Sequence, residues 1–202
     1  MKNPENIIKR TLKTVSTPRS TSESEASETI SKPTTKNKNV LLSDECLDHL
    51  NYRVQQEEYS GRIYLSMSLW LDNNGYVNGG KLWRRYSDEE MKHADLAREY
   101  LLAMGVQPAT AELEQPEQNF TGLPQIIKDS YQHEIDVTTQ IKELSSHALS
   151  MGDHMLYQLG LEYLKEQVEE HAKMQNWMDQ LLAFGEDKIA MRLLDHEMKD
   201  YL

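Results

Sequence analysis

Four long segments of this chain repeat apolar residues at steps of three and four, and one carboxylate interrupts each repeat well inside its segment. Residues at this spacing lie on one face of a helix. The interrupting residues are Glu57, Glu90, Glu134 and Glu170. None of the four apolar faces carries a Lys or an Arg. Four amphipathic helices of this kind predict a helical bundle with four carboxylates in its core.

The expected helices span about 44–72, 81–105, 124–151 and 154–183, with a short fifth helix at about 186–200. Ser43 and Asp153 are suitable N-caps, and Gly105 and Gly152 are suitable stops. Residues 107–124 are polar and long for a bundle connection, so they are expected to cross the length of the bundle. No segment alternates as a strand would. We therefore predict an all-α fold, a four-helix bundle with a long crossover between the second and third helices and a short fifth helix.

The first forty residues differ in composition from the remainder. They hold thirteen Ser or Thr and a net charge of +4, whereas residues 41–202 carry −15. We interpret residues 1–42 as a disordered arm and residues 43–202 as the folded domain. The basic, hydroxylated start of the arm also resembles an organellar transit peptide. The expected location is the cytoplasm, or a plastid or mitochondrion if the arm is such a peptide.

Composition excludes several classes of function. The acidic body repels nucleic acid and attracts cations. Cys46 is the single cysteine, so an intrachain disulfide or a cysteine-based metal cluster cannot form. No apolar run approaches the roughly 18 residues that span a bilayer, so no membrane association is expected.

The carboxylates predict a metal centre. Burying an ionised carboxylate is costly unless a cation pairs with it, and four converging carboxylates also repel one another. Glu90 and His93 stand three apart on one helical face, which adds an imidazole. Di-iron and di-manganese bundles use one Glu from each of two helices and Glu-x-x-His from each of the other two. Here the second pair is Gln167-x-x-Glu170, without a histidine, so the two metal sites should be unequal.

The four segments resemble the helices of non-haem ferritins of the bacterial type, part of the ferritin-like di-iron superfamily. The resemblance rests on "EEYSGRIYLSMSLW", "SDEEMKHAD", "YQHEIDVTTQI" and "LKEQVEEHAKM", and it covers roughly residues 44–200. It implies a first iron held by Glu57, Glu90 and His93. Glu90 would bridge to a second iron held by Glu134 and Glu170.

The resemblance also implies roles for neighbouring residues. Gln167 would lie close to the second iron, and Tyr64 matches a tyrosine beside the di-iron centre, although it could equally be a packed core aromatic. A third iron nearer the cavity would be held by Glu89, Glu166 and Glu169, which could alternatively form a solvated helix face. The implied activity is ferroxidase, with Fe(II) and O2 as substrates and two iron ions per subunit, or three if the third site is present. The implied assembly is a homo-oligomeric cage of 24 subunits that stores Fe(III) mineral.

Two alternatives remain open at this point. A haem-binding bacterioferritin would use Met91 as haem ligand, but Val168 stands where that family needs a glutamate, so no haem is expected. A DNA-protecting miniferritin would use the basic arm, but the arm's charge is small against that of the body, so no nucleic acid is expected.

Overall fold

The computed structural model describes residues 41–202, and in this range it is helical without strands. The long helices are α2 (Asp44–Asn73), α3 (Val77–Ala103), α4 (Leu123–Ser150) and α5 (His154–Phe184), followed by α6 (Lys188–Glu197) and a 3-10 turn, η1 (Met198–Tyr201). The predicted all-α fold is confirmed. The disordered arm was predicted for residues 1–42, and the transit peptide for the start of that arm. Residues 1–40 lie outside the described range. Among the described residues, none of the helices combines the length and the apolar composition that a membrane span requires.

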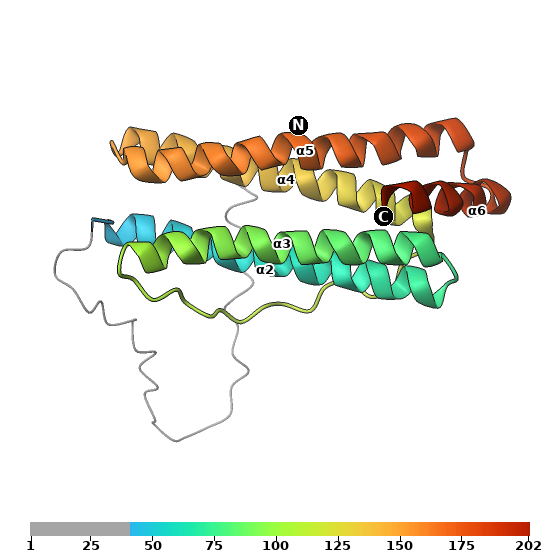
Figure 1. Cartoon of the computed structure of the whole chain (residues 1–202), viewed down its shortest axis with the longest axis horizontal. Helices are drawn as coiled ribbons and strands as arrows, with labels where there is room; N and C mark the ends of the chain where they lie inside the picture. The colour runs from blue at the N-terminus through green and yellow to red at the C-terminus, as the bar shows by residue number, and fades with distance from the viewer. Residues whose placement is uncertain (1–40) are drawn as a thin grey trace, which may run out of the picture. The chain divides into compact units, whose positions relative to one another are not determined.

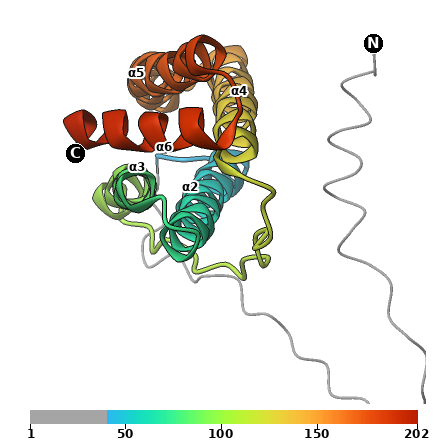
Figure 2. The ribbon, with the colours of Figure 1, turned by 90° about the vertical axis from the view of Figure 1, so that its right-hand side faces the viewer.

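The four long helices form two antiparallel pairs. α2 packs along α3 and α4 along α5, and Figure 1 shows the two pairs facing each other. Viewed along the helices, α6 lies across one end of the bundle (Figure 2). The crossover between α3 and α4 follows α2, because Gln55 Nε2 donates to the Glu112 carbonyl and Ser66 Oγ donates to the Glu117 carbonyl. The predicted crossover of the bundle is thus present.

Helix ends follow the predicted caps. The Ser43 side chain accepts a hydrogen bond from the Cys46 N–H at the start of α2, and Asp153 accepts one from the Leu156 N–H at the start of α5. Gly105 and Gly152 have φ values of 75° and 72° just past the ends of α3 and α4. These left-handed conformations suit glycine and stop each helix at the predicted place.

The predicted start of the second helix at about residue 81 is wrong, because α3 begins at Val77. Gly79 and Gly80 lie inside α3, in its first turn, where they permit close packing against neighbouring elements. The Gly79 N–H donates to Asp195 Oδ1 of α6 at 2.8 Å. A Cβ on Gly80 would lie 2.3 Å from Asp72 Oδ1. Close approach of two neighbouring elements therefore explains this glycine pair.

The core has two apolar clusters, one at each end of the bundle. The cluster beside α6 includes Trp83, Trp177 and Leu123, and the cluster at the opposite end includes Leu50 and Ile141. Between them every long helix contributes buried polar side chains: Glu57, Ser60, Ser87, Glu90, Ser130, Glu134, Gln167 and Glu170. A polar layer thus crosses the middle of an otherwise apolar bundle, at the level of the interrupted apolar faces.

Candidate metal centre

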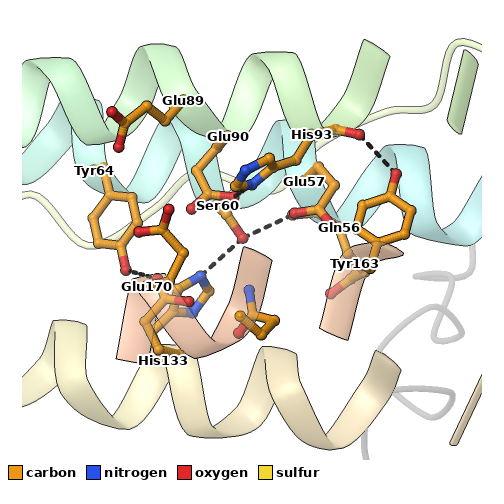
Figure 3. A network of polar contacts seen from close by, with 12 residues as sticks. Gln56, Glu57, Ser60, Tyr64, Glu89, Glu90, His93, His133, Tyr163 and Glu170 are labelled. Carbon is orange, nitrogen blue, oxygen red and sulfur yellow. Dashed lines mark hydrogen bonds and ion pairs between the residues drawn. The ribbon is translucent and has the colours of Figure 1, made fainter. Parts of the chain in front are cut away.

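The centre of this polar layer is a group of three side chains from α2 and α3. Glu57, Glu90 and His93 each offer a ligand atom, and these atoms all lie within 4.8 Å of one another. His93 Nδ1 is 3.4 Å from Glu90 Oε2. Figure 3 shows Glu57, Glu90 and His93 gathered between the helices, with Glu170 of α5 close by. Two carboxylates and one imidazole at this spacing can hold a divalent cation.

The opposite side of the layer contributes the remaining predicted ligands. Glu134 of α4 and Glu170 of α5 are 1% and 5% exposed, so their carboxylates face the interior. The Tyr64 hydroxyl donates a hydrogen bond to Glu134 Oε1. Gln167 is buried, and its Oε1 accepts a hydrogen bond from Thr138 at 2.7 Å. Every residue expected at the two metal sites therefore lies in or against the same layer.

The carboxyl groups strongly influence one another's ionisation. Burial raises the pKa of Glu90 well above its ordinary value, and the charges of Glu57 and Glu134 raise it further. Burial also raises the pKa of Glu134 to about 7, with repulsion from Glu170 and Glu57 added. Burial and the charge of Glu134 raise the pKa of Tyr64, which stays a phenol. In the absence of bound metal, some of these carboxyl groups hold protons that a metal ion would displace.

Two cations that the apolar faces did not reveal lie beside the carboxylates. Arg53, 2% exposed, places its Nε 2.7 Å from Glu57 Oε1. Lys173 places its Nζ 2.9 Å from both Glu170 Oε1 and Glu89 Oε2. Each stands next to an apolar face and reaches the layer through a long side chain. The sequence signal was their spacing, four residues before Glu57 and three after Glu170, which is the distance of a helical ion pair.

The three residues expected to hold a third iron are arranged differently. Glu89 is partly buried, while Glu166 is half-buried and Glu169 is exposed. Burial by itself would raise the pKa of Glu89, but the hydrogen bonds and charges of Lys173 and Arg85 outweigh it and the pKa is lowered. Burial would lower the pKa of Lys173, but its hydrogen bonds to Glu170 and Glu89 raise it. Glu89 therefore already has a permanent cationic partner, and the third iron stays a prediction.

A histidine next to the layer is held neutral. His133 Nε2 is 2.8 Å from Ser60 Oγ, and the Ser60 hydroxyl donates to the Gln56 carbonyl at 3.0 Å (Figure 3). Because that hydroxyl donates to a carbonyl, Nε2 must be the donor to Ser60 Oγ. Burial lowers the pKa of His133 to about 4, with the Arg53 charge acting in the same direction. His133 thus packs against Tyr64 without adding positive charge.

Two carboxylate oxygens of the layer lack a protein partner in the part of the chain that the structure describes. Glu57 Oε2 and Glu134 Oε2 are buried and, among the described residues, have no hydrogen-bond partner. A buried carboxylate oxygen without a partner is costly. Both atoms belong to predicted ligands on opposite sides of the layer. Bound metal would satisfy oxygens of this kind, and carboxylates with an imidazole are a donor set that fits iron.

Comparison with known proteins agrees with this geometry. The Ferritin family, described as a ferritin-like domain, matches residues 47–183. A bacterial non-heme ferritin of Campylobacter jejuni is 31% identical over 160 residues, which cover 79% of this chain and 96% of the relative. A bacterial non-heme ferritin of Escherichia coli O157:H7 is 27% identical over 158 residues, covering 78% and 96%.

Solved structures give the same picture. An open-pore ferritin from the hyperthermophilic archaeon Archaeoglobus fulgidus is similar with a TM-score of 0.75 and 30% sequence identity. The similarity covers 78% of this chain and 98% of the archaeal one. The family match over residues 47–183 takes in most of the four long helices that carry the polar layer.

Proposed function

This chain belongs to the ferritin-like family, and on that premise we propose that it stores iron by oxidising Fe(II) with O2 at the polar layer and depositing Fe(III) mineral. The observation that carries the proposal is the burial of four carboxylates, one from each long helix, with the His93 imidazole beside two of them. Iron storage is what its ferritin relatives support. Ferroxidase activity and the two-iron site are inferred from the residues.

Each metal site has its own ligand set in this proposal. Glu57, Glu90 and His93 bind the first Fe(II), and this site includes the imidazole. Glu90 bridges to a second Fe(II) that Glu134 and Glu170 bind, with Gln167 beside it. The second site has oxygen ligands only, so it should release iron more readily. The unequal pair would hold both ions for oxidation and then let Fe(III) leave.

The proposed reaction balances within this site. Two Fe(II) ions give up one electron each, and one O2 takes both electrons and two protons to become hydrogen peroxide. Carboxylates stabilise the harder Fe(III) product over Fe(II), which favours oxidation. Glu90 and Glu134 have raised pKa values, so they give up protons when metal binds. Tyr64 holds Glu134 by its hydrogen bond and orients it toward the layer.

The proposed assembly is a hollow homo-oligomer of 24 subunits. The ferritin relatives and the short α6 after the bundle support a cage in which mineral collects. Sedimentation of the iron-loaded protein tests the assembly, because a chain of 23.5 kDa in such a cage sediments far faster than a dimer. A dimer that oxidises iron without retaining it would contradict the storage proposal and leave the oxidation proposal standing.

Stopped-flow Fe(II) oxidation tests the site. Glu90→Gln removes the bridging carboxylate without changing side-chain size, and the fast phase should disappear. Glu99→Gln is the matched control, because Glu99 is exposed on the same helix. Equal fast rates in wild type and Glu90→Gln would overturn the assignment.

The two alternative functions have direct tests. Haem binding would require Met91, which is 41% exposed, while the position that would need a glutamate is Val168, 70% exposed. A haem titration that gives no Soret shift excludes it. DNA protection would require a gel shift that weakens with salt and depends on residues 1–40. A strong shift of the full chain at moderate salt would favour that alternative.

A further inference from the structure

A second cluster of metal-ligating side chains lies where α2 begins and α4 ends. Glu45 and His49 stand four residues apart on α2, so they share a face, and His147 lies in the last turn of α4. One ligand atom from each of the three residues lies within 4.8 Å of the other two. His147 Nε2 is 2.9 Å from Glu45 Oε1. The ring centroids of His49 and His147 are 4.6 Å apart.

Two further observations favour a cation here. His147 Nε2 is buried and, within residues 41–202, makes no well-aligned hydrogen bond, although the Glu45 oxygen is close. The contact with Glu45 therefore leaves the hydrogen-bonding capacity of this nitrogen unsatisfied. The cluster also lies at the C-terminal end of α4, where the carbonyl ends of the helix attract positive charge.

The cluster is separate from the polar layer of the bundle. His49 precedes Glu57 by eight residues on α2, a rise of about 12 Å. The buried apolar residues Leu50 and Val54 lie between them. The chemistry also differs, because this cluster offers two imidazoles and one carboxylate, while the layer offers one imidazole and several carboxylates.

We propose that Glu45, His49 and His147 bind one borderline divalent cation, of which Zn²⁺ is the representative, and so tie the start of α2 to the end of α4. Two imidazoles and a carboxylate suit ions of this class and leave coordination positions open to water. The partial exposure of Glu45 and His147 gives the ion access from solvent. The proposal is independent of the iron chemistry argued above.

Ligand counting by electron paramagnetic resonance of Cu²⁺ tests the site. The nitrogen superhyperfine structure reports how many imidazoles bind the copper ion, and Cu²⁺ binds such sites more tightly than Zn²⁺ does. The full chain carrying His93→Gln is used, because the polar layer then has no predicted imidazole ligand. The signal should show two imidazoles, and excess Zn²⁺ should reduce it. His49→Asn or His147→Asn added to this background should leave one imidazole at most.

His154→Asn is the matched control, because His154 is exposed and lies outside the cluster, so it should leave the signal unchanged. His49→Asn is the sharper variant. Without His49, the contact between Glu45 and His147 is a simple ion pair, so only His49 distinguishes a metal site from it. A signal with one imidazole or none, or a two-imidazole signal that survives His49→Asn, would overturn the proposal. Circular dichroism checks that each variant keeps its helices.

Discussion

Arg53 Nε lies 2.7 Å from Glu57 Oε1, and both side chains are almost completely buried. The guanidinium neutralises a predicted iron ligand from within the same helix. It also donates to Gln140 Oε1 at 3.2 Å, which ties α2 to α4. An internal cation thus balances part of the charge of the layer before any metal arrives.

Arg53→Met should destabilise the metal-free protein, because it leaves the Glu57 carboxylate buried without its partner. Removing one member of a buried ion pair costs about 3–5 kcal/mol. The double variant Arg53→Met with Glu57→Gln should recover most of this loss. Urea unfolding of the metal-free proteins measures both, with Arg62→Met on the exposed face of α2 as control. Equal stabilities of wild type and Arg53→Met would contradict the pairing.

The stability of the metal-free protein should depend on Glu134 and pH. The pKa of Glu134 in the folded protein, about 7, lies above the unfolded value. The stability that this group contributes is therefore complete at low pH and is lost as pH rises through 7. One pKa unit corresponds to about 1.4 kcal/mol, which makes the total loss roughly 3 kcal/mol. Glu134→Gln should remove this dependence.

The neighbouring His133 acts in the opposite direction. Its folded pKa of about 4 lies below the unfolded value, so stability from this group rises with pH across the same region. The informative quantity is therefore the difference in unfolding free energy between wild type and Glu134→Gln, measured by denaturation from pH 4 to 8. As pH increases, the free energy of unfolding of wild type should fall relative to that of Glu134→Gln. The exposed Glu143→Gln serves as control. A pH-independent difference would contradict the raised pKa.

Lys173 should control whether a third iron binds. Its ammonium contacts both Glu89 and Glu170, so it already neutralises the negative charge that would attract another cation. Lys173→Met should leave Glu89 with Arg85 as its single remaining cationic partner in the described part of the chain and raise anaerobic Fe(II) binding from two to three ions per chain. Lys165→Met, an exposed site on α5, should leave the number at two. Unchanged stoichiometry in Lys173→Met would show that Glu89, Glu166 and Glu169 do not form a site.

The sequence predicted the fold and the layer well because both depend on helical period. In the sequence alone, either of the adjacent residues Glu57 and Glu58 could face the core, because a shift of one residue in helical phase exchanges them. The structure buries Glu57, while Glu58 pairs with Arg98 of α3 at the edge of the bundle. Only packing against a second helix could decide between them.

Other features depend on three-dimensional reach. Arg53 and Lys173 stand beside the apolar faces, and the length of their side chains brings their charges to the carboxylates. The helical period predicts on which face a Cβ atom lies, but it does not predict where the end of a long side chain lies. The predicted second helix begins after Gly79 and Gly80, whereas contacts with α6 and the end of α2 explain their place inside α3. The cluster of Glu45, His49 and His147 joins residues a hundred positions apart and could not be found without the fold.

The central claim is that two iron ions bind together within one subunit and are oxidised as a pair. Anaerobic titration of the metal-free chain with Fe(II), followed by a limited pulse of O2, tests it most directly. We predict saturation at two Fe(II) per chain, consumption of one O2 for every two ions in the first turnover, and loss of this phase in Glu90→Gln and His93→Gln. The loss should be at least the roughly 10–100-fold that removal of an outer-shell partner costs. Oxidation in Glu90→Gln at the wild-type rate and stoichiometry would contradict the account.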